Sequence, residues 1–405
     1  MSYYVVGGPY FNHLTRTLSA PAMSPAAVAT FPVAGVYDNR SNMPAYFSTA
    51  TADSTVTADL CAIPDPSFEA GISSWTAVSG TMTQSNTEKN TGTYSAKFAA
   101  AGSSYYAFTA RAGEARQISA ALYGGGGSCA ARVRLYCVET GHYLQSGGAS
   151  WGASSDLFSR TTASWATSTQ AYTVEPVATT LSETVTLRVY VEQVNAGTTY
   201  RDDVVDIPGV TWGSVHGHNI GAAITPKFES SPDNSSWTAR ITPTLRRDSF
   251  FGTCAVQYLR YWRLKCEGTP GAAIFLGEVV LGQYFTLNTN PLYPGSQDNV
   301  EAQVRLDGAD GAQWVYSRGG APRRRLLMSF AYRNDADYVQ AKDVLFRGSR
   351  GGAHLLVIAP TEMDSSVAIL GRLRESFTSI KSDYWSRSGE FEVDEEPLPN
   401  IAYVP

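Results

Sequence analysis

Short stretches in which apolar and polar residues alternate constrain the fold of this 405-residue chain more than any other feature. Examples are Val185–Val191, Ala130–Tyr136 and Ala255–Leu264. Successive side chains of a β-strand point to opposite faces of the sheet, so the alternation predicts strands with one buried and one solvated face. We therefore expect a mainly β protein of stacked β-sandwiches.

One segment, 335–348, has helical spacing instead. Its apolar residues can gather on one side of a helix, and Asn334 or Asp335 can cap the start. The C-terminal part is therefore expected to be a β-rich α+β domain with one helix.

The composition is that of a globular protein, with 43% hydrophobic residues, 17% charged residues and a net charge of −5. At roughly 150 residues per domain, the length predicts two or three domains. No apolar run approaches the roughly 20 residues of a spanning helix. The start, Met1–Gly8, lacks the basic flank of a signal peptide. We expect neither membrane insertion nor classical secretion.

The five cysteines are an odd number and show no Cys-x-x-Cys spacing. This pattern favours neither a disulfide framework nor a zinc site. Free and mostly buried thiols are expected.

Charge density divides the chain into regions. Residues 62–208 carry 21 charged side chains in 147 residues, whereas residues 291–405 carry 29 in 115. The Pro-rich stretch Pro291–Gly295 is typical of a linker. We expect one domain at 62–208, inserted into a discontinuous domain of 1–61 and 209–290, and a C-terminal domain at 291–405.

The middle region contains Pro64–Trp75, Thr91–Phe98 and Tyr200–Asp206 in an order that resembles the jelly-roll carbohydrate-binding modules of families 4 and 9. Those modules open with an Asn-Pro-Ser-Phe-Glu strand, followed by a Trp, and close with a Tyr-x-Asp-Asp-Val strand. The resemblance covers about 145 residues. It implies a jelly roll, a glycan ligand and a structural calcium ion.

The first and last strands of a jelly roll lie side by side, so Glu69 and Asp203 are expected to converge. Two carboxylates that meet need a cation or a proton between them, and calcium prefers oxygen ligands. Glu69 and Asp203 are therefore the predicted metal ligands. The alternative is that both are solvated or paired with Lys97 and Arg201.

Glycans bind by stacking on aromatic rings and by a few hydrogen bonds. Trp151 lies in a polar, Gly-rich loop whose own residues cannot bury it, so an exposed ring is expected. Trp165, Tyr143 and Tyr105 are further candidates, while Trp75 is expected in the core. For each candidate the alternative is an ordinary core or rim aromatic.

The enclosing region resembles a galactose-binding-like, discoidin-type sandwich of phage tail proteins. The resemblance lies in Thr55–Leu60, His216–Asn219, Phe228–Trp237, Tyr258–Leu264 and Ile274–Gly282. His216 and His218 have the spacing of neighbours on one strand face, but two ligands rarely hold zinc. A structural turn is the preferred interpretation.

The C-terminal region resembles a recurrent domain of tail-tip and distal tail proteins of long-tailed bacteriophages. The similarity lies in the order of Trp314–Tyr332, Ala353–Pro360, Ile369–Arg374 and Tyr384–Glu396. Arg323, Arg324 and Arg325 stand in a net-negative region, so nucleic-acid binding is not expected. We expect them at a subunit interface with the acidic end of a neighbour, including Glu395 and Glu396, as in head-to-tail rings. The alternative is a solvated turn.

The resemblances together imply a structural component of a phage tail tip or baseplate that also contributes to attachment to host cell-surface polysaccharide. Such a protein would be a ring or trimer in the virion, assembled in the host cytoplasm with other tail proteins. The alternatives are a purely structural tail protein whose jelly roll binds nothing, or a non-catalytic part of a carbohydrate-active system. No nucleotide, nucleophile-elbow or zinc-protease motif occurs, so we expect no enzyme.

Overall fold

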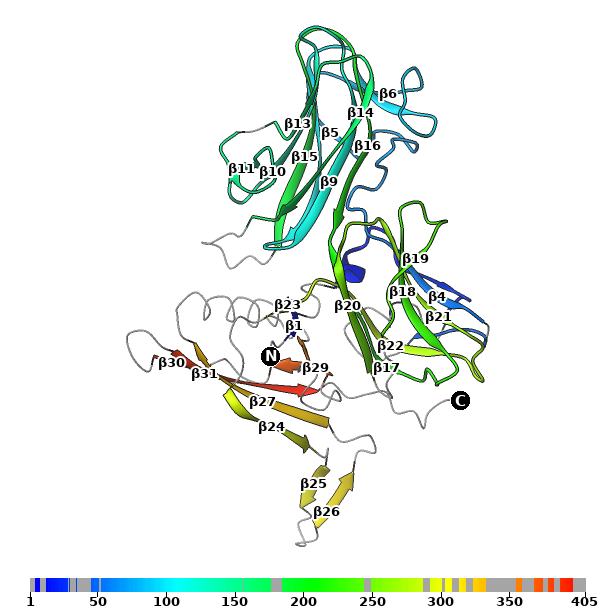
Figure 1. The fold of residues 1–405 in the computed structure, drawn as a ribbon, viewed down its shortest axis with the longest axis vertical. Helices are drawn as coiled ribbons and strands as arrows, with labels where there is room; N and C mark the ends of the chain where they lie inside the picture. Colours follow the sequence, from blue (N-terminus) through cyan, green and yellow to red (C-terminus); the bar gives the residue numbers. More distant parts are fainter. Residues whose placement is uncertain are drawn as a thin grey trace. The chain divides into compact units, whose positions relative to one another are not determined.

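The structure of the chain is a computed structural model (Figure 1). It describes residues 4–7, 12–27, 29, 34, 45–50, 52–154, 156–175, 184–243 and 249–286, together with strands at 292–300, 303–307, 313–317, 323–332, 355–358, 368–373, 378–381 and 387–395.

Antiparallel sheets dominate these residues, so the predicted mainly β class is confirmed. The one helix in the described part of the chain is the short 3-10 helix η1 (His13–Arg16), capped by Asn12, whose Oδ1 accepts from the Leu14 amide at 3.2 Å. No helix among the described residues is long and apolar enough to cross a membrane. The helix expected at 335–348 lies outside the described residues.

The chain divides into two compact units. Unit 2 comprises Asp59–Gly209 with Tyr258–Arg260, and unit 1 comprises the remaining residues, including 261–405. The ends of unit 2 lie next to the insertion boundaries expected at 62 and 208.

Unit 2 is a sandwich of two antiparallel sheets (Figure 1). The first has the order β12-β11-β10-β15-β8-β5, with β13 also paired to β10. The second has the order β14-β9-β16-β7-β6. The strands are β5 (Thr76–Ser79), β6 (Met82–Ser85), β7 (Ser95–Phe98), β8 (Gly102–Arg111), β9 (Ala115–Tyr123), β10 (Ala130–Cys137), β11 (His142–Leu144), β12 (Trp151–Gly152), β13 (Phe158–Arg160), β14 (Trp165–Thr173), β15 (Thr184–Val194) and β16 (Thr199–Pro208).

The core of unit 2 lies between its two sheets and includes Phe68, Phe98, Ile118, Leu135 and Val189, all fully buried. These residues occupy the apolar positions of the alternating pattern, as the sequence predicts. Trp75, 8% exposed, also lies in this core, so its predicted place is confirmed.

The strand expected to open unit 2 at 64–69 is not formed. The segment makes turns instead, because the Asp65 carboxylate accepts from the amides of Glu69 and Ala70 and Phe68 adopts a φ of 59°. It still runs beside β16, where the Val204 amide donates to Pro66 O at 2.9 Å.

Unit 1 contains two sheets with the orders β20-β17-β22-β3 and β19-β18-β21-β4-β2. Their strands are β2 (Ala22–Ser24), β3 (Ala45–Tyr46), β4 (Ser54–Asp59), β17 (Val210–His218), β18 (Thr225–Ser231), β19 (Thr238–Ile241), β20 (Ser249–Gln257), β21 (Tyr261–Glu267) and β22 (Phe275–Gly282). Trp212, Phe228, Phe250, Trp262 and Phe275 are buried in this unit.

The single strand expected at 255–264 is in fact two. β20 ends at Gln257 and β21 begins at Tyr261, and the two strands belong to different sheets. Between them, Arg260 pairs with Asp59 at 2.8 Å, and its carbonyl accepts from the Leu60 amide. These contacts interrupt the alternating stretch.

A third sheet of unit 1 has the order β23-β1-β28-β29-β31-β27-β24, with β30 also paired to β31, and β25 and β26 form a separate pair. The strands are β1 (Tyr4–Gly7), β23 (Phe285–Thr286), β24 (Leu292–Val300), β25 (Gln303–Asp307), β26 (Gln313–Ser317), β27 (Arg323–Tyr332), β28 (Leu355–Ile358), β29 (Ala368–Leu373), β30 (Thr378–Lys381) and β31 (Arg387–Glu395).

Two expectations for this part are corrected. β1 pairs with β28, Val5 opposite Val357, so the N-terminal residues join the C-terminal sheet and not the enclosing sandwich. The linker expected at 291–295 is largely strand, because β24 spans Leu292–Val300.

Candidate functional site

The outward surface of β8, β10, β11 and β15 carries a cluster of aromatic and cationic side chains that we call the tyrosine face. All of its members are partly exposed, and none belongs to the core. They are Tyr105, Arg134, Tyr136, Tyr143, Arg188 and Tyr190.

Two neighbouring rows across the strands make up the tyrosine face. In one row, Tyr190 of β15 stands between Arg134 of β10 and Tyr105 of β8. In the next, Tyr136 of β10 stands between Tyr143 of β11 and Arg188 of β15. Residues directly opposite on antiparallel strands lie within contact distance, so the register brings the rings together.

The rings form a continuous series. The centroid of Tyr190 lies 5.4 Å from that of Tyr105 and 6.2 Å from that of Tyr136, which in turn lies 4.8 Å from Tyr143. Burial raises the pKa of Tyr143, so its hydroxyl is protonated at neutral pH.

Both arginines lie over the rings. The Arg134 guanidinium is 4.9 Å from the Tyr143 centroid and 5.8 Å from that of Tyr190, and Arg188 is 4.6 Å from Tyr105. Cations at such distances are attracted to the π face. Arg134 also pairs with Glu192, which accepts a hydrogen bond from Ser103 Oγ at 3.2 Å.

The tyrosine face thus combines flat apolar rings with fixed donors and acceptors. Partly exposed rings can stack on the C–H faces of sugars, while arginine, hydroxyl and carboxylate groups can bind sugar hydroxyls.

The structure places two of the candidate glycan residues, Tyr105 and Tyr143, on the tyrosine face. The sequence analysis missed Tyr136, Tyr190, Arg134 and Arg188. The signal was available, because the alternation in Ala130–Tyr136 and Val185–Val191 puts each of these residues on the polar side of its strand.

Trp151 does not present the free ring that was expected. Its loop folds over β14, where the indole Nε1 donates to Thr173 O at 3.0 Å and the ring meets Tyr172 edge-on at 6.2 Å. The half-buried ring packs against the core of unit 2.

Trp165 lies on the other sheet of unit 2. It contacts Tyr123 at 5.7 Å between centroids, and Tyr123 contacts Tyr200 at 5.6 Å. This second aromatic row is separate from the tyrosine face because the two sheets turn their outer faces in opposite directions.

The predicted metal ligands Glu69 and Asp203 both bind the segment 90–94. Glu69 Oε1 accepts from the amides of Thr93 and Tyr94 at 2.7 and 2.9 Å. Asp203 accepts from Asn90 Nδ2 at 2.9 Å and from Thr91 Oγ1 at 2.8 Å. The expected alternative partners, Lys97 and Arg201, form no ion pair with either acid in the described residues.

Backbone geometry brings Asp203 to this position. The register between β16 and β9 shifts between Asp202 and Val205, and Asp203 has a φ of 49°. A bulge of this kind redirects a side chain. The described residues contain no group of three or more His, Cys, Asp or Glu side chains that could hold a metal ion, so an ion here would also need backbone or amide oxygens.

The histidines expected in a turn lie in strand β17 and are buried. His216 Nε2 is 3.1 Å from Ser214 Oγ, and His218 Nδ1 accepts from the Ile220 amide at 3.1 Å.

The arginines expected at a subunit interface begin strand β27, which pairs with β31 of the same chain. In this register Arg325 is opposite Asp394, and Glu395 is opposite Gly371 of β29. The basic and acidic segments are thus already adjacent within one chain. Glu396 lies outside the described residues.

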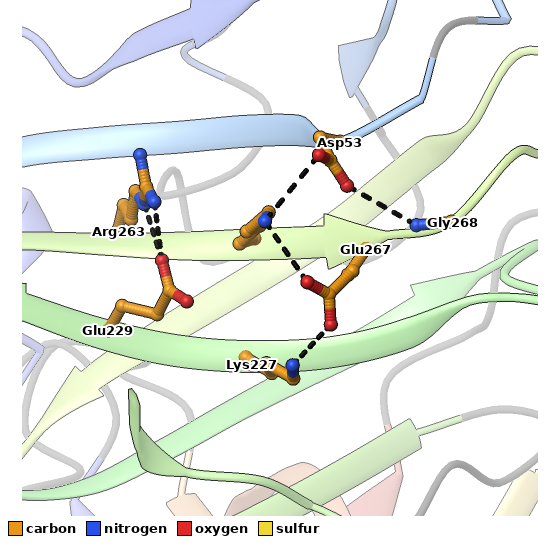
Figure 2. A network of polar contacts seen from close by, with 7 residues as sticks. Asp53, Lys227, Glu229, Arg263, Glu267 and Gly268 are labelled. Carbon is orange, nitrogen blue, oxygen red and sulfur yellow. Dashed lines mark hydrogen bonds and ion pairs between the residues drawn. The ribbon is translucent and has the colours of Figure 1, made fainter. Parts of the chain in front are cut away.

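The outer surface of β18 and β21 in unit 1 carries a network of paired charges (Figure 2). Arg263 pairs with Glu229 at 2.6 Å, and Lys227 pairs with Glu267. Lys265 contacts Glu267 at 3.2 Å and Asp53 at 3.5 Å. Each cation of this network has a carboxylate partner within the network, so its charges are already paired.

No family model matches the sequence, and no curated protein matches it. Among solved structures, the chain is similar to a "Family 16 Carbohydrate Binding Module-2", with 13% identity, a TM-score of 0.28, and coverage of 36% of this chain and 99% of that one. It is also similar to the CBM22-1 xylan-binding domain of Paenibacillus barcinonensis Xyn10C, with 15% identity, a TM-score of 0.28, and coverage of 37% and 95%. A third is TmCBM61, described in complex with β-1,4-galactotriose, with 15% identity, a TM-score of 0.26, and coverage of 36% and 98%.

Proposed function

We propose that unit 2 is a carbohydrate-binding module and that the tyrosine face is its glycan-binding surface. The observation that carries the proposal is the series of four partly exposed tyrosines on adjacent strands, from Tyr105 through Tyr190 and Tyr136 to Tyr143. Contiguous aromatic surface left outside a core is characteristic of binding sites.

The surroundings of the rings support a polar ligand with apolar faces. Arg134, Glu192 and Ser103 form a hydrogen-bonded group at one side of the rings. Stacking holds a sugar ring, and these groups select among its hydroxyls.

The test is binding of the full-length protein to a panel of soluble polysaccharides by affinity gel electrophoresis. We expect retardation by at least one glycan, and a loss of affinity of about tenfold or more for Tyr190→Ala, which corresponds to about 1.4 kcal/mol. Tyr123→Ala is the matched control, because Tyr123 belongs to the aromatic row of the other sheet. No retardation by any glycan, or equal losses in both variants, would contradict the proposal.

We further propose that the protein is a non-catalytic, oligomeric component of a phage tail tip or baseplate, located in the virion and bound to other tail proteins. Support comes from the sequence resemblances of 1–61, 209–290 and 291–405. Light scattering and electron microscopy of the purified protein test it, because a ring or trimer is expected and a monomer would count against it. The alternative, a structural protein with a non-binding jelly roll, leaves the tyrosine face without a role.

A calcium ion beside Glu69 and Asp203 is also a proposal. Its support is that both carboxylates bind one segment, 90–94, at the bulge of β16. Such an ion would hold the segment against the last strand, and we assign it no part in glycan recognition.

A further inference from the structure

On the proposed glycan-binding face, we infer that Arg188 recognises an anionic group, so that the preferred ligand is an acidic glycan bearing carboxylate or phosphate. The inference rests on the proposed function and names the class of glycan that this face selects.

Two other arginines of this surface are neutralised by carboxylates. Arg134 pairs with Glu192, and Arg132 pairs with Asp156 at 3.0 Å. Glu139, which follows β10, binds the Thr186 amide with both carboxylate oxygens at 2.9 Å. These acids are therefore already engaged.

Arg188 differs from these arginines. Within the described residues no carboxylate lies within ion-pair distance of its guanidinium, whereas Arg132 and Arg134 each have one. Its neighbours are instead the rings of Tyr105, Tyr136 and Tyr190, and the hydrogen bond with Tyr190 raises its pKa above the usual value. It is a permanent cation in a largely aromatic setting.

The position of Arg188 leaves room for a ligand. Its opposite neighbour on β8 is Ala107, a small and exposed residue that leaves the surface beside the guanidinium open. A guanidinium held over an aromatic ring is preorganised to receive a carboxylate or phosphate through two parallel N–H bonds. A sugar stacked on Tyr105 or Tyr190 would bring its carboxylate or phosphate substituent to the guanidinium of Arg188.

The experiment compares polygalacturonate with its fully methyl-esterified form, because the two differ in charge and share a backbone. A glycerol-phosphate polymer and a neutral xylan complete the set, and all are measured on the full-length protein. We expect at least tenfold tighter binding to polygalacturonate than to its ester, weakening several-fold from 50 to 300 mM NaCl. Binding to the phosphate polymer alone would also support an anionic ligand and would assign the group to phosphate.

Arg188→Gln should abolish the preference for the acidic polymer. Arg188→Lys keeps the charge but lacks the two parallel N–H donors of the guanidinium, so it should retain only part of the preference. Arg263→Gln, in the paired network of unit 1, removes the same charge from the chain and should leave the preference intact. Thermal unfolding of each variant verifies that it is folded.

The outcomes separate the two proposals. Equal binding to charged and neutral polymers, or an unchanged preference in Arg188→Gln, would overturn the role of Arg188 and leave glycan binding standing. Binding to none of the polymers or of the wider panel would overturn both.

Discussion

Arg116 and Asp206 form a buried ion pair inside unit 2, with 2.6 Å between Arg116 Nε and Asp206 Oδ1 and side chains that are 3% and 0% exposed. Glu114 contacts the same guanidinium at 2.8 Å, and the Tyr172 hydroxyl donates to Asp206 at 2.6 Å. Burial alone would lower the pKa of Arg116, but the two carboxylates raise it, so the arginine stays charged. The pair joins β9 to β16, the strand that leaves the unit.

Replacing Arg116 by Met should destabilise unit 2 by about 3–5 kcal/mol, because it leaves Asp206 and Glu114 buried without a cation. Urea unfolding followed by fluorescence measures the loss. Arg132→Met is the control, since its pair with Asp156 is about one-third exposed and should contribute less than about 1 kcal/mol. Similar effects of the two substitutions would show that burial does not set the strength of the pair.

Trp151→Ala should lower stability rather than glycan affinity. The indole packs on the core and donates to Thr173 O, so its removal should cost about 2–3 kcal/mol, less than the 3–5 kcal/mol of a fully buried tryptophan. Thermal unfolding measures this, and affinity electrophoresis well below the melting temperature should show unchanged binding. A selective loss of binding in a fully stable variant would instead restore Trp151 to the glycan surface.

The alternating pattern predicted the fold class because period two carries the inward and outward faces of a strand directly. It also placed Tyr136 and Tyr190 on outward positions, whereas the ring of Trp151, expected to be exposed, is half-buried against the core. Loop composition does not reveal that β12 pairs with β11 and brings the indole over β14. Such a contact depends on chain segments about 20 residues apart, which a local pattern cannot show.

The other differences have two causes, long-range strand pairing and local turns. The N-terminal strand Tyr4–Gly7 pairs with residues about 350 positions later, and no local signal marks that partner. At 64–69, the Asp65 turn replaces the expected strand because side-chain hydrogen bonds to the backbone compete with sheet pairing. Glu69 and Asp203 reach one segment through this turn and through the β16 bulge, neither of which the alternation indicates.

Asp202 should make the stability of unit 2 depend on pH. Burial raises its pKa to about 6, and the nearby Asp203 adds to the effect, although the amides of Asn90 and Thr91 bind its carboxylate. The pKa of Asp202 is about 4 in the unfolded chain and about 6 in the folded one. At a pH between these values the folded state binds more protons than the unfolded state. The free energy of unfolding should therefore fall as the pH rises from 4 to 6.

Asp202→Asn removes the titrating group, so the contribution of this residue to the slope between pH 4 and 6 should disappear. Urea unfolding of the wild type and the variant across this range measures it. Asp156→Asn serves as the control, since Asp156 pairs with Arg132 of the other sheet and is about one-third exposed. Identical slopes in wild type and Asp202→Asn would exclude Asp202 as the source.

Calcium should stabilise the protein if the ion proposed beside Glu69 and Asp203 binds. An ion present at about 100 times its Kd would add about 2.7 kcal/mol to the free energy of unfolding, so chelation should lower the melting temperature by several degrees. A cation binds carboxylates in their charged form. The amides of Tyr94 and Thr93 already lower the pKa of Glu69, which favours that form. Differential scanning fluorimetry with EDTA, calcium or magnesium measures the effect.

Glu69→Gln keeps an oxygen for the two amides but removes the charge, and it should abolish the calcium response. Glu175→Gln is the control. Glu175 follows β14 and binds His142, so this variant should retain the calcium response. A melting temperature that is the same in EDTA and in calcium would refute the site. The contacts of Glu69 and Asp203 with segment 90–94 would then only hold that segment in place.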